Sequence, residues 1–238
     1  MRLSAPIFRL KRHARLLSRS TGNPLHQALD HVARDEGFRS WSHLAAAARE
    51  GAGPGARVLN GLVPGDLVLL GARPGQGKTL LALEMVAEAA AAGRQAFFFT
   101  LDYTERDVRE RMTAPGVAQA IASGRIVIDT SDEICADHVV DRLHDAPHGT
   151  LAVIDYLQLL DQRRQTPELG RQVDVLKTFA RTAGTIIVTI SQIDRAFDAQ
   201  EQRLPTLADV RLPNPIDLKL FARTCFLHDG EIRLEAVA

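Results

Sequence analysis

The sequence lacks the features that would place the protein outside the ordinary globular class. Lys and Arg number 29, and Asp and Glu number 29, so the formal net charge is zero. Any nucleic-acid binding must therefore use a local patch and not an overall basic character. No apolar run approaches the ~20 residues that span a membrane as a helix, and we find no internal repeat. A chain of 238 residues then predicts one large domain, with or without a small addition, and no membrane partner.

Cysteine is also scarce. The chain has two cysteines, Cys135 and Cys225, and they lack the spacing of a metal site. Each falls within a segment of apolar periodicity. We therefore expect both to be reduced core residues of a cytoplasmic protein.

One stretch has the layout of a phosphate-binding loop. Residues 67–79 are LVLLGARPGQGKT: an apolar run predicts a buried strand, a loop rich in Gly and Pro follows, and Lys78-Thr79 begins an alanine-rich helix. Gly75 and Gly77 allow the backbone to curl so that its N–H groups face an anion. The helix N-terminus adds positive potential there. Lys78 suits the β- and γ-phosphates of a nucleotide, and the Thr79 hydroxyl suits Mg²⁺.

The loop departs slightly from the strict pattern, because Ala72 stands where the first Gly is usual and Gly71 comes one residue earlier. An ordinary turn between a strand and a helix is the alternative. The order of strand, loop, Lys-Thr and helix favours the phosphate loop. We expect ATP to bind along the whole loop, at Ala72, Arg73, Pro74, Gly75, Gln76, Gly77, Lys78, Thr79 and Leu80.

The N-terminal residues differ from the rest of the chain. Residues 7–19, IFRLKRHARLLSR, have apolar residues at helical spacing with basic residues between them, which predicts a basic amphipathic helix. Two further short helices follow. We expect a small basic helical unit over residues 1–50, a Gly- and Pro-rich linker over 51–57 and a second domain over 58–238.

The basic helix suggests two kinds of partner, DNA phosphates or another protein. No base-reading motif is visible in this segment. The ordinary alternative is a solvated charged face on a docking element, so the partner of residues 1–50 is left unknown.

The second domain alternates between predicted strands and helices. This alternation predicts an α/β fold, with a mostly parallel sheet covered by helices on both faces and ligands bound at the carboxyl ends of the strands. The expected strands are a pair within residues 58–70 that turns at Pro64-Gly65, single strands over 95–101, 125–129, 151–155 and 185–190, and a final hairpin of 223–228 and 231–235 that turns at Asp229-Gly230.

Polar residues follow several of these strands. Asp155, after an apolar run, suits the carboxylate that orders the water shell of Mg²⁺. Asp102 is placed to polarise an attacking water, with Glu105 in reserve, and the Gln192 amide could sense a γ-phosphate. Asp at a strand end is often only a cap or turn former, but four such groups on one rim favour nucleotide hydrolysis. The predicted catalytic residues are Lys78, Asp102, Asp155 and Gln192, and the predicted metal ligands are Thr79 and Asp155.

Several motifs resemble the RecA-type ATPase domain of the DnaB-family replicative helicases. Beyond the phosphate loop, VIDYLQLL (153–160) resembles the DYLQL motif of that family and is the most family-specific stretch. SQIDR (191–195) resembles SQLNR, LADVR (207–211) resembles SDLR, and FTLDYTERDV (99–108) resembles the FSLEM segment. The resemblance covers residues 58 to about 228.

The resemblance implies a RecA-like phosphate-loop NTPase that uses ATP and Mg²⁺ and works as a homo-oligomer on single-stranded DNA. It implies that Gln192 couples the γ-phosphate to DNA-facing loops near 161–170 and 194–206. Arginines in these loops suit phosphate contacts, although solvated loop charges are the ordinary alternative. They are Arg163, Arg164, Arg195 and Arg203.

The chain departs from the family pattern in three respects. The catalytic Glu of the family aligns with Asp102, which is one methylene shorter. The Lys-x-Arg element that reaches a neighbouring subunit's nucleotide is missing from the printed sequence, so another arginine would have to replace it. The N-terminal collar of the family is replaced by the small helical unit. The candidates for the missing arginine are Arg195, Arg211 and Arg223.

Two functions remain open. The first is an ATP-dependent, DNA-associated motor or a reduced relative of one. The second is a nucleotide-dependent regulatory or binding module with little turnover, which docks a partner through its N-terminal helices. A small-molecule phosphotransferase would need a substrate lid or an acceptor site, and the sequence has a signal for neither.

Overall fold

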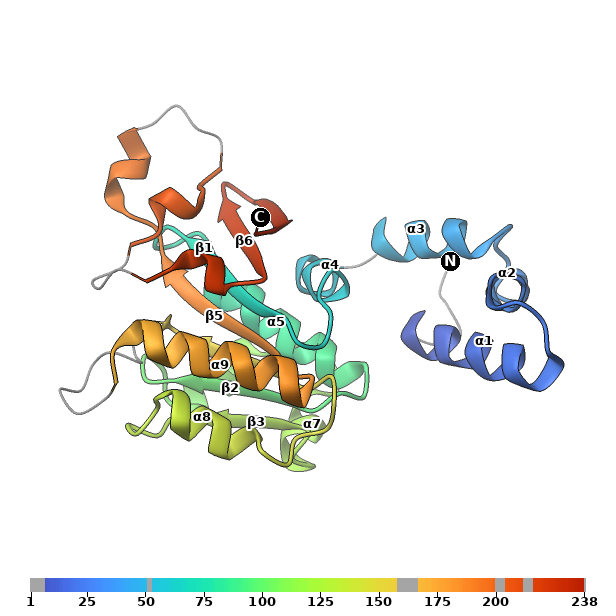
Figure 1. Cartoon of the computed structure of the whole chain (residues 1–238), viewed down its shortest axis with the longest axis horizontal. Helices are drawn as coiled ribbons and strands as arrows, with labels where there is room; N and C mark the ends of the chain where they lie inside the picture. The colour runs from blue at the N-terminus through green and yellow to red at the C-terminus, as the bar shows by residue number, and fades with distance from the viewer. Residues whose placement is uncertain (1–6, 51–52, 158–166, 200–203, 212–215, 238) are drawn as a thin grey trace. The chain divides into compact units, whose positions relative to one another are not determined.

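The chain forms two compact units, one ending at Gly53 and the other beginning at Pro54. We describe each unit by itself. Of the helices in the described ranges, none is both long and apolar enough to cross a membrane. The computed structural model describes residues 7–50, 53–157, 167–199, 204–211 and 216–237 (Figure 1).

The N-terminal unit contains three helices around a small core. Gly37, with φ 82°, ends the second helix, and the backbone N–H of Trp41 donates to Asp30 Oδ1 at 2.8 Å, which joins the third helix to the second. The helices are α1 (Ile7–Thr21), α2 (Leu25–Asp35) and α3 (Trp41–Glu50). The buried side chains between them are Leu10, Ala14, Ala28, Val32, Ala33 and Leu44.

The second unit is built on one seven-stranded sheet with the strand order β3-β2-β4-β5-β1-β6-β7. Every neighbouring pair is parallel except β6 with β7. The α/β prediction and the predicted final hairpin are therefore confirmed. The strands are β1 (Leu67–Ala72), β2 (Ala96–Thr100), β3 (Ile126–Asp129), β4 (Leu151–Asp155), β5 (Ile186–Gln192), β6 (Arg223–His228) and β7 (Glu231–Ala236).

Helices cover both faces of this sheet, so the central strands are buried on both sides (Figure 1). This explains why strands such as LVLLGA in β1 are apolar without alternation. One face packs against α4 (Pro54–Asn60), α5 (Lys78–Ala91), α6 (Glu105–Arg111) and α7 (Val117–Ala122), and the other against α8 (Ala136–Leu143) and α9 (Leu169–Ala183). Three 3-10 helices follow β5, namely η2 (Arg195–Ala199), η3 (Leu207–Asp209) and η4 (Leu218–Leu220).

The predicted linker and the first strand of the predicted pair are wrong, because α4 occupies residues 54–60. Pro54 takes the first helical position, where its missing N–H costs nothing. At Gly55 a Cβ atom would lie 2.6 Å from Glu84 Cβ, and its N–H donates to Glu84 Oε2 at 3.1 Å. The glycine that suggested flexibility therefore allows α4 to pack closely against α5.

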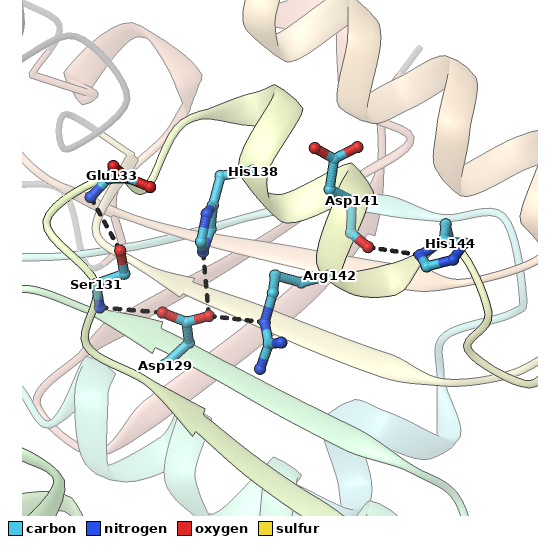
Figure 2. A network of polar contacts seen from close by, with 7 residues as sticks. All are labelled: Asp129, Ser131, Glu133, His138, Asp141, Arg142 and His144. Atoms are coloured by element: carbon cyan, nitrogen blue, oxygen red, sulfur yellow. Dashed lines mark hydrogen bonds and ion pairs between the residues drawn. The ribbon is translucent and has the colours of Figure 1, made fainter.

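The turn between β3 and α8 is organised by Asp129 (Figure 2). One carboxylate oxygen accepts the Ser131 N–H at 3.0 Å. The other accepts Arg142 Nε at 3.0 Å and lies 3.1 Å from His138 Nε2. Because Arg142 and His138 belong to α8, this single carboxylate ties the helix to the end of the strand.

Helix α8 begins later than the sequence predicts. We expected a start at Ser131 or Asp132, but the helix begins at Ala136. The Asp129 carboxylate holds residues 131–134 in a turn, in which the Ser131 hydroxyl in its turn accepts the Glu133 N–H. A local side-chain contact has therefore replaced the first helical turn.

The two cysteines have different surroundings, and both are free. Cys225 lies buried in β6, and burial raises the pKa of its thiol to about 12. Cys135 is half-buried at the N-cap of α8. The prediction of a core residue is confirmed for Cys225 and wrong for Cys135.

Candidate functional site

The phosphate loop connects β1 to α5 in the predicted order. Gly75 and Gly77 have φ values of 82° and 85°, and a Cβ atom on either would meet nothing within 4 Å. The left-handed backbone, and not crowding, therefore requires glycine at these positions. Gly77 is the N-cap of α5 and has no side chain to cap it, so the first N–H groups of the helix are available to an anion.

The end of β4 meets this loop directly. Thr79 Oγ1 donates to Asp155 Oδ2 at 3.0 Å. Asp155 is only 2% exposed, and burial raises the pKa of its carboxyl to about 6, although the Thr79 hydrogen bond and the charge of Lys78 act in the opposite direction. A hydroxyl and a carboxylate oxygen within hydrogen-bonding distance are the type of oxygen donors that Mg²⁺ prefers, usually together with substrate phosphates.

Asp102 lies on the same rim. It follows β2, in which Thr100 is aligned with Asp155 of β4. Partial desolvation raises the pKa of Asp102, and the charge of Lys78 opposes this shift. Lys78 therefore acts electrostatically on both carboxyl groups, which places the three charges around one point at the mouth of the phosphate loop.

Gln192 is the last residue of β5 and is aligned with Ala72, where the phosphate loop begins. Its backbone carbonyl accepts the Arg211 N–H at 2.8 Å, and the next residue, Ile193, donates its N–H to Ala72 O at 3.1 Å. The half-buried Gln192 side chain thus stands between the loop and the segments that follow β5. The chemical roles of Lys78, Asp102, Asp155 and Gln192 stay predictions.

Two contacts of the phosphate loop were not predicted. Gln76 exchanges hydrogen bonds with Asp229 in the turn between β6 and β7: the Asp229 N–H donates to Gln76 Oε1 at 2.8 Å, and Gln76 Nε2 donates to Asp229 Oδ1 at 3.4 Å. Arg73 Nη1 donates to the Ile193 carbonyl at 3.2 Å. These partners are more than a hundred residues apart in sequence, and no local pattern indicates them.

The predicted arginines have different outcomes. Arg195 is exposed at the start of η2. Arg223 pairs with Asp66 at 3.0 Å at the start of β6, the opposite end of the sheet from the phosphate loop, so it is a poor replacement for a missing finger at this site. Arg163, Arg164 and Arg203 lie outside the described residues.

A family model fits this chain. The model of the DnaB-like helicase C terminal domain matches residues 56–126 and 116–218, which together exceed half of the chain. The chain belongs to this family. Its RecA-like ATPase fold and the position of its phosphate loop are those predicted from the motifs.

Two relatives show how far the DnaB-like similarity extends. The Replicative DNA helicase DnaB of Mycoplasma genitalium is 26% identical over 196 residues, which are 68% of this chain and 42% of the relative. That of Helicobacter pylori strain 26695 is 27% identical over 183 residues, or 64% and 38% of the two chains. The chain thus spans less than half the length of these curated relatives.

Solved structures agree on the DnaB-like fold. A DnaB-like replicative helicase, described with its interactions with primase, has a TM-score of 0.59 at 17% identity, with 74% of this chain and 55% of that chain covered. An ATPase domain solved by itself has a TM-score of 0.55 at 17% identity, with 73% and 81% covered. A KaiC-like protein of Pyrococcus horikoshii has a TM-score of 0.52 at 18% identity, with 70% and 74% covered. At these identities the likeness concerns the fold alone.

Proposed function

We propose that this protein is a Mg²⁺-dependent ATPase of the DnaB type that acts on or with single-stranded DNA as a homo-oligomer. The hydrogen bond from Thr79 Oγ1 to Asp155 Oδ2, at 3.0 Å, carries the proposal. It joins the hydroxyl of a phosphate loop to a buried carboxylate at the end of a neighbouring strand, which is the pair that a nucleotide-bound Mg²⁺ requires.

Binding uses the backbone as much as the side chains. The N–H groups at the start of α5 and the curl at Gly75 and Gly77 hold the phosphates. Lys78 adds a point charge toward the β- and γ-phosphates. When bound, Mg²⁺ supplies charge neutralisation between phosphate oxygens, with Thr79 and Asp155 as its protein-side partners.

Hydrolysis requires a group that positions water. Asp102 stands at the mouth of the loop, where the charge of Lys78 reaches it, and in our proposal it orients the attacking water. Gln192 lies beside the loop at the end of β5. It would pass the state of the γ-phosphate to the segment that begins at Ile193 and includes the DNA-contact candidate Arg195.

The first experiment is steady-state ATP hydrolysis by the full chain with and without single-stranded DNA, with Lys78→Ala as the test variant. We expect at least about a hundredfold loss of turnover, because a preorganised charge at the transferred phosphoryl group is removed. Lys219→Ala is the matched control, since Lys219 is an exposed lysine in η4, before the start of β6. Normal ATP binding and turnover by Lys78→Ala would show that the phosphate-loop assignment is wrong.

A second candidate is a nucleotide-dependent regulatory module with little turnover. Asp102 favours it, because an aspartate in place of the family's glutamate holds water one methylene further from the phosphate. This candidate predicts tight ATP binding with slow turnover that DNA does not stimulate. Strong stimulation by DNA would support the motor.

A further inference from the structure

The chain is neutral overall, but its charge is divided unevenly. Residues 1–50 contain nine Lys and Arg against four Asp and Glu, so they carry a formal charge of +5. The remaining residues contain 20 against 25 and carry −5. The first acidic residue is Asp30, so the whole of α1 lacks a carboxylate.

The positive charge of α1 is gathered on one face. Arg12, Arg15 and Arg19 recur at i, i+3 and i+7, which places them in one row, and Lys11 lies beside this row. All four side chains are exposed. Leu10 and Ala14, on the opposite side of the helix, are 5% and 0% exposed in the core of the unit.

These four charges have no internal partner. In the part of the chain that the structure describes, none of the four makes an ion pair or a side-chain hydrogen bond. The acidic residues of α2 are engaged elsewhere: Asp30 accepts the Trp41 N–H, and Asp35 lies 3.8 Å from His31. The row is therefore neither neutralised nor needed to hold the unit together.

The chemistry of the row fits a nucleic-acid backbone better than a lipid surface. An amphipathic helix that binds a membrane inserts its apolar face, but the apolar face of α1 is already buried. Arg12, Arg15 and Arg19 offer guanidinium groups, which bind phosphate with paired hydrogen bonds. From Arg12 to Arg19 the helix rises about 10 Å, and a DNA duplex has about six phosphate charges over that length.

We infer that the exposed row of α1, formed by Lys11, Arg12, Arg15 and Arg19, binds the phosphate backbone of DNA without reading its sequence. This contact lies outside the ATPase unit and requires no nucleotide. It gives the protein a second hold on DNA, independent of the loops that follow β4 and β5 and of the proposed function.

The test measures DNA binding by the full chain in EDTA without nucleotide, so that the ATPase site takes no part. Anisotropy of a fluorescein-labelled duplex and of the matching single strand is recorded over a salt series from about 50 to about 300 mM NaCl, the range in which phosphate contacts dominate the salt dependence. We expect the double variant Arg12→Gln with Arg15→Gln to bind the duplex about tenfold more weakly at the lowest salt. The slope of log K against log salt should become shallower by about 1.8, since each phosphate contact contributes about 0.9.

The matched control is Arg34→Gln with Arg39→Gln. It removes the same charge from exposed positions of the same unit but leaves α1 unchanged, and it should bind like the wild type. An equal loss in the control would mean that only the total charge matters and would overturn the inference, as would unchanged affinity and slope in the α1 variant. If the α1 variant altered oligomeric state and not DNA binding, the inference would also be overturned, and the row would instead dock on the acidic unit of a second copy.

Two further variants separate this inference from other failures. Arg15→Lys keeps the charge and should retain most of the binding, so it serves if circular dichroism shows that the double variant has lost helix. Lys78→Ala should keep the whole α1-dependent signal. If the protein lacked ATPase activity but still showed the α1-dependent binding, the proposed function would fail and the inference about α1 would stand.

Discussion

At the scale of single residues, Asp155 combines a functional position with a cost in stability. An Asp carboxyl titrates near about 3.9 in an unfolded chain, and burial raises its pKa to about 6 in the folded protein. Between these pH values the folded state binds more protons than the unfolded state. The free energy of unfolding therefore falls as the pH rises from about 4 to about 6, and the stability provided by the neutral carboxyl is lost above about pH 6.

Asp155→Asn should remove this dependence, because an amide stays neutral at every pH. Without nucleotide and Mg²⁺, we expect the variant to be about 2–3 kcal/mol more stable than the wild type at about pH 7.5 and nearly equal to it at about pH 4. Urea denaturation at the two pH values measures both differences. ATP hydrolysis should be lost, since the carboxylate is proposed to hold the metal. Equal stability at the higher pH would show that Asp155 is ionised in the folded protein at little cost.

Asp102 allows a second test at this scale. If it holds the attacking water, Asp102→Glu extends the carboxylate by one methylene and should raise turnover about tenfold, a part of the usual contribution of a general base. The assay is steady-state hydrolysis at saturating ATP. Asp137→Glu, at an exposed position in the first turn of α8, is the matched control and should have no effect. No change, or a fall, in Asp102→Glu would count against the assignment.

At the scale of elements, local signals predicted what local physics determines. The strands β1, β2, β4 and β5 are short apolar runs between turn residues, and the phosphate loop is set by Gly, Lys and Thr in one continuous segment. The capping box of α6 was also predicted, and Thr104 and Asp107 form it. In each case the residues that decide the structure are neighbours in sequence.

Elements decided by distant residues could not be predicted in this way. Gly and Pro in residues 51–57 suggested a linker, but Glu84 and the surface of α5 select a helix there. The link between Gln76 and Asp229 requires β6 to lie beside β1, which the sequence does not indicate. The predicted grouping of polar strand ends needed only the general rule that parallel strands end on the same edge.

Asp129 provides a test of how α8 is held. Asp129→Ala removes the acceptor of the Ser131 N–H, of Arg142 and of His138, so we expect a loss of about 2–3 kcal/mol in the free energy of unfolding. Asp141→Ala is the matched control, because Asp141 is an exposed residue of the same helix (Figure 2) and should change stability by less than about 0.5 kcal/mol. Urea denaturation measures both, and similar losses in the two variants would mean that Asp129 does not tie α8 to β3.

At the scale of the whole molecule, the two compact units should respond differently to nucleotide. The chain has one tryptophan, Trp41, in the N-terminal unit, so its fluorescence reports on that unit, while far-ultraviolet circular dichroism reports mainly on the larger one. ATP with Mg²⁺ at about 100 times the Kd should stabilise the second unit by about 2.7 kcal/mol. We expect the melting transition seen by circular dichroism to rise and that of Trp41 to stay unchanged. A common shift would show that the two units unfold as one.

The position of β1 in the sheet has a consequence for how the protein is made. The strand that leads into the phosphate loop pairs with β5 (Ile186–Gln192) and β6 (Arg223–His228), both more than a hundred residues downstream. At about 5–20 residues per second, a ribosome needs on the order of ten seconds to supply them. During that time an apolar strand waits without either neighbour, so the segment that binds nucleotide in the finished protein is also the one most in need of protection from aggregation during synthesis.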